Sequence, residues 1–314
     1  MKKMLLLLTL SFVLFAACSE SDDPVILSDL DDRTQALYDK LPDPDNCDGG
    51  MINAAQKNEA LARINFIRTT IGLPEVVYDG DQDESLQAAA LLMAVNNKLD
   101  HNPTAADKCY SEDAAHGASA NLWMGTSGGY YPWTPTQMID DLINDQDVQT
   151  LGHRLWLLSP FMDETAFGRV DYLDGNVRTA SCVYVDNHEV NSATSNANVQ
   201  FIAYPRNEIP STAFSLSWYL HFSIFIDKND IWKNTADFTN AQIIVEDGNG
   251  NKMTVTNIDY LDPNPTTMSG YTNMIKWKVP GLKKDEQYKV TINNVKSAAG
   301  NNNYTYTFTI SDEA

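Results

Sequence analysis

The chain has 314 residues, of which 22 are Lys or Arg and 42 are Asp or Glu, giving a formal net charge of −20. Hydrophobic residues make up 43% of it, enough for a packed core, so an intrinsically disordered chain is excluded. The acidity argues against a nucleic-acid partner and against a polybasic contact with anionic lipid head groups, because both need clustered Lys and Arg. We expect a soluble acidic surface, and the length predicts two domains.

The N-terminus has the pattern of an export signal. Two lysines precede a short apolar run that ends in small residues, and the run is too short to span a bilayer comfortably. We therefore interpret residues 1–17 as a signal peptide. Cys18 directly follows two alanines, which resembles the bacterial lipobox, where the peptide is cleaved before a cysteine that becomes lipidated. The alternative is an ordinary signal peptide with an incidental cysteine.

The lipobox resemblance implies that the lipid on Cys18 anchors the protein to the outer or cell membrane, with the folded part at the cell surface. Residues 19–23, which read SESDD, resemble the surface-export signal of Bacteroidota lipoproteins, and a short acidic linker is the alternative. The whole stretch 18–50 is acidic and contains prolines. We predict that it is a lipid anchor and acidic tether.

Three helices are predicted in the first half of the chain. Apolar residues recur at three- and four-residue intervals over 58–71 and again over about 83–99. The third helix has clear start signals, because Thr134 can act as N-cap, Pro135 takes the first helical position and Gln137 completes a capping box. A short apolar turn follows at residues 155–158.

After residue 160 the apolar period changes to two, which is typical of strands. Repeated short strands separated by turn residues favour a β-sandwich. The sequence therefore predicts an α+β domain over residues 51–208 and an all-β domain over residues 209–314, whose last strands resemble those of Ig-like or fibronectin-type sandwiches. The predicted strands are 166–171, 179–186, 199–204, 218–226, 241–246, 252–256, 273–279, 287–295 and 303–311.

Three cysteines remain beyond the lipobox, namely Cys47, Cys109 and Cys182. Their wide spacing has no C-x-x-C character, so a zinc or thioredoxin-like role is weakly supported. An exported protein can form disulfides, and an odd count leaves at least one thiol unpaired in a monomer. We expect one structural disulfide, and the sequence does not say which pair forms it.

Five short motifs follow one another in the first half. Together and in this order they resemble the CAP superfamily, the cysteine-rich secretory, antigen 5 and pathogenesis-related group, also called SCP-like. The resemblance covers about residues 55–205 and implies an α-β-α sandwich with a central cleft. The motifs are Asn65-x-x-Arg68, Leu99-Asp100-His101-Asn102, Ser119-Ala120-Asn121, Gly152-His153-Arg154 and Phe167-Gly168.

In that family two histidines and two acids line the cleft. Carried over to this sequence, the histidines are His101 and His153. The acid on the third helix best matches Asp145, and Asp141 is the fallback. Each histidine also has a plain structural alternative, in which it caps a helix or a turn by bonding to backbone groups.

The second family acid is missing, because Ala120 stands where the family has Glu. Glu112 or Asp113 would have to replace it from the long loop. Two imidazoles and one carboxylate can still hold Zn²⁺ or another divalent ion. The resemblance therefore implies His101 and His153 as metal ligands, should a metal be bound.

These patterns favour a lipoprotein that binds a ligand through a histidine-lined cleft. The ligand would be a small molecule such as a lipid, a glycan, or a protein partner. The rival is a metal-assisted hydrolase that uses the same cleft and a bound water. A third alternative is a structural surface adhesin with a vestigial cleft. The resemblance does not choose, because one fold can carry several activities. An aromatic loop could contribute to binding or fill the core, and its members are Trp123, Tyr130, Tyr131 and Trp133.

Overall fold

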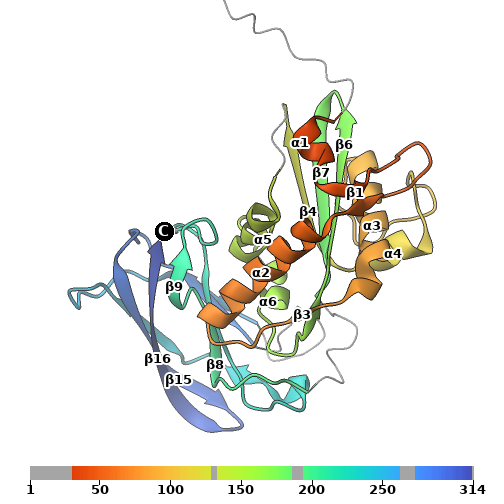
Figure 1. Cartoon of the computed structure of the whole chain (residues 1–314). Helices are drawn as coiled ribbons and strands as arrows, with labels where there is room; N and C mark the ends of the chain where they lie inside the picture. Colours follow the sequence, from red (N-terminus) through yellow and green to blue (C-terminus); the bar gives the residue numbers. More distant parts are fainter. Residues whose placement is uncertain (1–29, 129–132, 186–193, 262–272, 313–314) are drawn as a thin grey trace, which may run out of the picture.

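The structure, a computed structural model, describes residues 30–128, 133–185, 194–261 and 273–312. It is a mixed helix-and-sheet protein of the α+β class, as predicted (Figure 1). The predicted signal peptide over residues 1–17 and the predicted lipidation site Cys18 lie outside the described residues. Within the described part, no helix has the length and apolarity needed to cross a membrane.

Residues 30–50 are packed against the rest of the protein, so the predicted tether is wrong for this stretch. The segment contains α1 (Asp32–Gln35) and β1 (Tyr38–Lys40), and β1 pairs antiparallel with β2 (Met51–Ile52). A disulfide joins Cys47 to Cys109, and the Tyr38 hydroxyl donates to Asp171 at 2.6 Å. The acidic and proline residues that suggested a tether lie on the outside of this anchored segment.

The helices follow the predicted pattern with shifted ends. In α5 the Thr134 side chain and Gln137 form the predicted capping box, with Pro135 in the first turn. The helix predicted over 83–99 ends earlier, because Asn97 adopts a left-handed backbone with φ 51°. The predicted apolar turn is part of a short helix, α6. The helices are α2 (Ala54–Thr70), η1 (Gly80–Gln82), α3 (Asp83–Asn96), α4 (Glu112–Gly117), α5 (Pro135–Asn144) and α6 (Gly152–Leu157).

A three-stranded antiparallel sheet lies at the centre of the first half, in the order β4 (Asn121–Ser127), β7 (Asn176–Val183), β6 (Phe167–Asp174). Leu122 and Cys182 pack with α3 on one face of this sheet. Trp123 and Phe167 pack with α2 and α5 on the other face. Helices therefore cover both faces (Figure 1). A two-stranded parallel sheet lies beside them, formed by β3 (Val77–Tyr78) and β5 (Glu164–Thr165).

The outer edge of β6 is closed by side chains instead of another strand. The Tyr38 hydroxyl bonds to the backbone N–H of Asp171 at 2.8 Å, and Gln87 Oε1 accepts from the N–H of Arg169 at 2.6 Å. Helix α3 also lies very close to this strand, because a Cβ on Gly168 would stand 2.6 Å from the backbone of Leu86. Glycine is therefore required there, and the strand edge has no room for a partner strand.

The second half is a β-sandwich of two sheets. One has the order β13-β14-β10-β8, and in the other β15 pairs with β11, β12 and β16, which in turn pairs parallel with β9. The sheets face each other where the rings of Phe201 and Phe222 meet Tyr304. The strands are β8 (Phe201–Tyr204), β9 (Asn207–Pro210), β10 (Leu220–Ile224), β11 (Ala236–Asp237), β12 (Gln242–Glu246), β13 (Thr256–Tyr260), β14 (Ile275–Lys278), β15 (Gln287–Ser297) and β16 (Gly300–Ser311), with the 3-10 helix η2 (Ile231–Lys233) between β10 and β11.

The strand pairing places the beginning of the all-β part earlier in the chain than predicted. β8 and β9 begin before residue 209, yet β8 pairs with β10 and β9 with β16. The all-β part therefore starts at Phe201, because a strand belongs to the sheet with which it bonds. The predicted strand 252–256 is also wrong, since the strand there begins at Thr256. One apolar cluster runs across the junction and includes both Ile64 of α2 and Trp277 of β14. Whether the halves fold separately stays a prediction.

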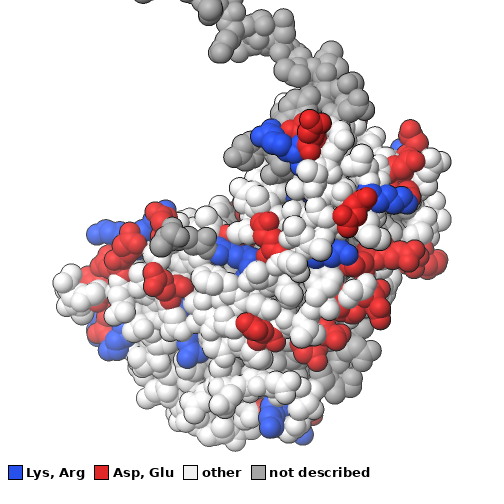
Figure 2. All heavy atoms as spheres, viewed as in Figure 1, with Lys and Arg blue, Asp and Glu red and all other residues white. Residues whose placement is uncertain are grey.

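Acidic side chains are unevenly spread over the visible face. Figure 2 shows one group of them over the side of the molecule that carries α3 and α4. A second group, with Lys and Arg among it, lies at the opposite end over the sandwich, whereas the lower face of the sandwich is largely uncharged in this view.

Candidate functional site

The predicted residues Asp145 and His153 come together in the turn between α5 and α6. Asp145 ends α5 with a left-handed backbone (φ 52°), and Leu151 begins α6 in the same conformation (φ 55°). The turn aims the fully buried Asp145 carboxylate back at α6. Its Oδ1 lies 2.8 Å from His153 Nδ1, and its Oδ2 accepts from the backbone N–H of Arg154 at 3.2 Å.

The carboxylate fixes how His153 presents its ring. In the neutral imidazole, Nδ1 carries the proton and donates it to Asp145, which leaves Nε2 as an acceptor. The side chain is 25% exposed. No described residue bonds to Nε2, so this nitrogen can accept a hydrogen bond or coordinate a ligand from solvent.

His101 is held in the same tautomer by a different partner. It lies in the loop after α3 and is exposed, and its Nδ1 stands 2.7 Å from the carbonyl oxygen of Ala118. A carbonyl can only accept, so Nδ1 carries the proton and Nε2 is again the acceptor. His101 thus bonds to the backbone, but to Ala118 at the end of α4 and not to the end of α3, the helix that the capping alternative had in view.

The segment Ala118–Asn121 links the two histidines. Ala118 bonds to His101, and the Asn121 side chain donates to the backbone carbonyl of His153 at 3.0 Å. No direct contact joins the two imidazoles within the described ranges. The structure therefore brings Asp145 to His153 and places both histidines against one short segment.

The donor set fits a metal poorly. Within the part of the chain that the structure describes, no group of three or more His, Cys, Asp or Glu side chains is arranged to hold a metal ion. Both oxygens of Asp145 are already bonded, and Ala120, at 3% exposure, lies in an apolar cluster. The residues present offer two imidazoles and no free carboxylate, so we derive no chemical step through a metal.

The fallback acids lie elsewhere. Asp141 accepts from Trp123 Nε1 at 2.9 Å, and burial raises the pKa of its carboxyl. Glu112 and Asp113 are exposed on α4, where Glu112 accepts from the Tyr110 hydroxyl at 3.3 Å. Neither Glu112 nor Asp113 bonds to His101 or His153 in the described structure, so the missing family acid has no substitute in these contacts.

Two arginines of the motifs have a structural role. Arg68 is fully buried and donates to the carbonyls of Pro74, Leu157, Ser159 and Met162 at 2.9–3.0 Å. It therefore holds the loop after α2 and the end of α6 in one arrangement.

Arg154, the neighbour of His153, joins the site to the sandwich. Its guanidinium donates to the carbonyls of Ile143, Asn144 and Tyr219 at 2.6–2.7 Å. Burial lowers the pKa of Arg154 to about 10. Because Tyr219 belongs to the all-β part, the position of α6 depends on that part.

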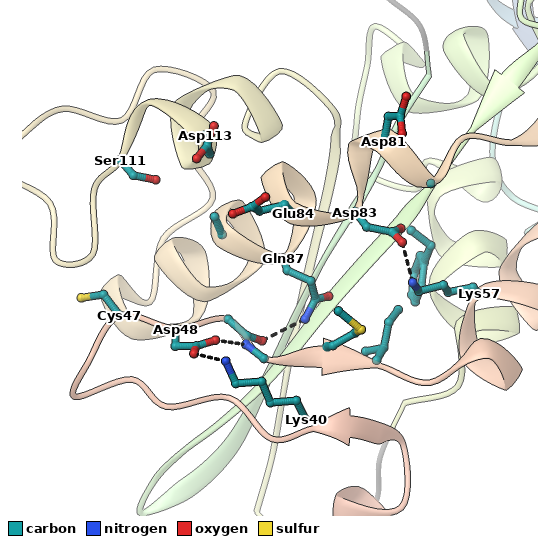
Figure 3. A pocket seen from close by; sticks show the side chains of 17 residues that line it. Lys40, Cys47, Asp48, Lys57, Asp81, Asp83, Glu84, Gln87, Ser111 and Asp113 are labelled. Atoms are coloured by element: carbon teal, nitrogen blue, oxygen red, sulfur yellow. Dashed lines mark hydrogen bonds and ion pairs between the residues drawn. The ribbon is translucent and has the colours of Figure 1, made fainter.

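A charged cavity of about 830 Å³ lies between the N-terminal segment and α3 (Figure 3). Lys57 pairs with Asp83 at 2.5 Å, and Lys40 forms an ion pair with Asp48. Gln87 donates to the backbone carbonyl of Gly49 at 2.9 Å and so fixes one wall. The sequence does not predict this cavity, because the acidic and proline-containing stretch that includes residues 30–50 is typical of a tether. A cysteine in that stretch was the available signal that the segment could be fastened to the fold.

The aromatic loop is only partly described. Trp123 and Trp133 pack edge to face with their ring centroids 5.4 Å apart, whereas Tyr130 and Tyr131 lie outside the described residues. His116 is exposed on α4, and His188 also lies outside the described ranges. Comparison with protein-family models finds no match to this chain, and none of the curated proteins matches it.

Proposed function

We propose that the protein is an extracytoplasmic lipoprotein whose α+β part is a CAP domain and whose sandwich is Ig-like. In this proposal it binds a lipid, glycan or protein ligand at His101 and His153. A lipid on Cys18 holds it at the outer membrane or cell surface. The sandwich positions the binding domain through the contact between Arg154 and Tyr219.

The CAP assignment is supported by the connected roles of the motif residues. Asn65 bonds to the backbone of Val76 through both ends of its amide, at 2.8 and 2.9 Å. Arg68 fastens the end of α6, and Gly168 allows α3 to approach the sheet. Motifs that are far apart in the sequence thus stabilise the same helices and strands that carry His101 and His153.

The observation that carries the binding proposal is the shared tautomer of the two histidines. Each ring uses Nδ1 on an acceptor of the protein, Asp145 in one case and the Ala118 carbonyl in the other. Each therefore keeps Nε2 as an acceptor to which no described residue bonds. Two such acceptors suit a ligand with hydroxyl or amide donors.

The hydrolase alternative is favoured by one observation, the pairing of His153 with a buried carboxylate. A carboxylate–histidine pair can take a proton from water or from a nucleophile. The missing family acid at Ala120 counts against it, because among the described residues no second carboxylate bonds to the pair. Binding is therefore the better-supported function.

Histidine ring signals in NMR spectra test the binding proposal. The exported chain would be titrated separately with Zn²⁺, with palmitate and with a soluble muropeptide, and the variants would be His101→Ala, His153→Ala and the exposed control His116→Ala. We expect at least one probe to shift the His101 and His153 signals, to lose affinity in both cleft variants and to bind the control normally. Shifts at neither histidine with all three probes would contradict the proposal.

Export is supported by the disulfide between Cys47 and Cys109, because disulfides form in oxidising compartments. Lipidation is tested by Cys18→Ala, which should release the protein from the membrane fraction. Unchanged membrane retention of that variant would contradict a lipid anchor.

A further inference from the structure

A second groove lies at the junction of the two halves, away from His101 and His153. It has a volume of about 740 Å³, within the roughly 300–1,000 Å³ typical of small-ligand pockets. Helix α2 forms one wall, and β9 with the end of β16 forms the other. The fold builds it from segments more than a hundred residues apart, so no local motif marks it.

Phe66 is the apolar centre of this groove. It is 46% exposed, whereas Ile64 and Ile67 of the same helix are fully buried. The Arg63 guanidinium lies 5.3 Å from its ring centroid and is fixed by Asp140, with N–O distances of 2.6 and 2.9 Å. Phe66 therefore offers solvent an aromatic surface on a rigid support.

Polar side chains also line the groove. Each makes one hydrogen bond within the protein, which leaves a second polar atom available to a ligand. Asn207 Nδ2 donates to the Thr70 carbonyl at 2.5 Å, which leaves its Oδ1 as an acceptor. Glu208 Oε1 accepts from the Ser311 hydroxyl at 2.7 Å, which leaves Oε2. The groove thus combines an aromatic surface with preorganised acceptors.

The charges in the groove exclude an anionic ligand. Arg63 is neutralised by Asp140, and Asp312 pairs with Lys284 at 2.6 Å. Glu208 has no cation partner among the described ion pairs, so the groove carries net negative charge. The ligand should therefore carry no negative charge, and it should have an apolar face for the ring and several hydroxyl donors for the acceptors.

We propose that this groove binds a neutral oligosaccharide, with a sugar ring stacked on Phe66 and its hydroxyls bonded to Asn207 and Glu208. Pyranose rings have the required combination of an apolar C–H face and a rim of hydroxyl groups. The proposal is independent of the histidine site, because no residue is shared between the two.

Calorimetry on the exported chain tests it, with cellohexaose, maltohexaose and chitohexaose as neutral probes and hexagalacturonate as the anionic one. We expect millimolar or tighter binding of at least one neutral probe and none of hexagalacturonate. Phe66→Ala should weaken binding at least about tenfold, and Phe66→Leu should do the same if the ring itself is needed. Glu208→Gln should weaken binding less.

The matched control is Tyr260→Ala, which removes an aromatic residue that is 41% exposed on β13, outside the groove. This variant and His153→Ala should both bind as wild type does. The proposal is overturned if no neutral probe binds at millimolar concentration, or if Phe66→Ala binds like wild type. Equal losses in Phe66→Ala and Tyr260→Ala would overturn it too, because they would indicate nonspecific contact.

Discussion

The two halves of the molecule are stabilised by different chemistry. In the α+β part, three of the largest fully buried side chains are Arg68, Arg154 and Arg169, and two of them bond to backbone carbonyls at helix ends and in loops. In the sandwich, the corresponding side chains are aromatic, among them Trp277 and Phe308. Irregular loops around a site need directional bonds to stay in place, whereas paired strands satisfy their own backbone groups.

The comparison predicts that arginine removal is the most damaging change. Arg68→Met should keep most of the apolar volume but leave four carbonyls without their donor, at a cost of at least about 4 kcal/mol in the free energy of unfolding. Phe308→Leu in the sandwich should cost about 1–1.5 kcal/mol. Urea unfolding measures both values. Equal costs would show that the two halves do not differ in this way.

Removal of the disulfide should have the next largest effect. Cys47 and Cys109 are separated by 62 residues, so Cys47→Ser with Cys109→Ser should lower the free energy of unfolding by about 2–4 kcal/mol. Amides of residues 30–50 should then exchange faster than those of the sandwich. Reductant should bring wild type to the stability of the double variant and leave that variant unchanged. No loss in either case would mean that the segment is held without the disulfide.

A smaller, pH-dependent effect is expected at the junction. Burial, followed by the positive charge of Arg154, lowers the pKa of His221 well below its usual value. Once the pH falls below about 6.5, His221 therefore binds a proton in the unfolded chain but not in the folded chain. Stability should then drop by up to about 1.4 kcal/mol per pH unit. His221→Phe should have a shallower pH dependence between pH 6.5 and 5, and His116→Gln should keep the wild-type slope. Identical slopes in all three proteins would contradict the buried position.

Local signals in the sequence were reliable where the structure is local. The capping box at Thr134 follows from residues of a single helical turn. The boundary at residue 209 was placed too late because β8 pairs with β10, which follows β9 along the chain, and strand pairing is a property of the folded sheet. The tether over residues 30–50 failed for the same reason, since its disulfide partner is distant in sequence.

The residues of the candidate site could be predicted, but their hydrogen bonds could not. Family resemblance gave His101, His153 and Asp145. Only the fold shows that the two carboxylate oxygens of Asp145 form hydrogen bonds with His153 and Arg154. The carbonyl of Ala118 carries no side-chain signal, so its bond to His101 could not be read from the sequence. The groove beside Phe66 was missed because its walls meet only after the two halves pack together.

The central claim is that His101 and His153 both present an unprotonated Nε2 outward. Nitrogen-15 NMR of the histidine rings tests it directly, because the coupling pattern distinguishes the two neutral tautomers. The account predicts that both neutral rings carry the proton on Nδ1, with the exposed His116 as the reference. A proton on Nε2 of either His101 or His153 would contradict it, because that ring could not donate to its carboxylate or carbonyl partner and would present no acceptor to a ligand.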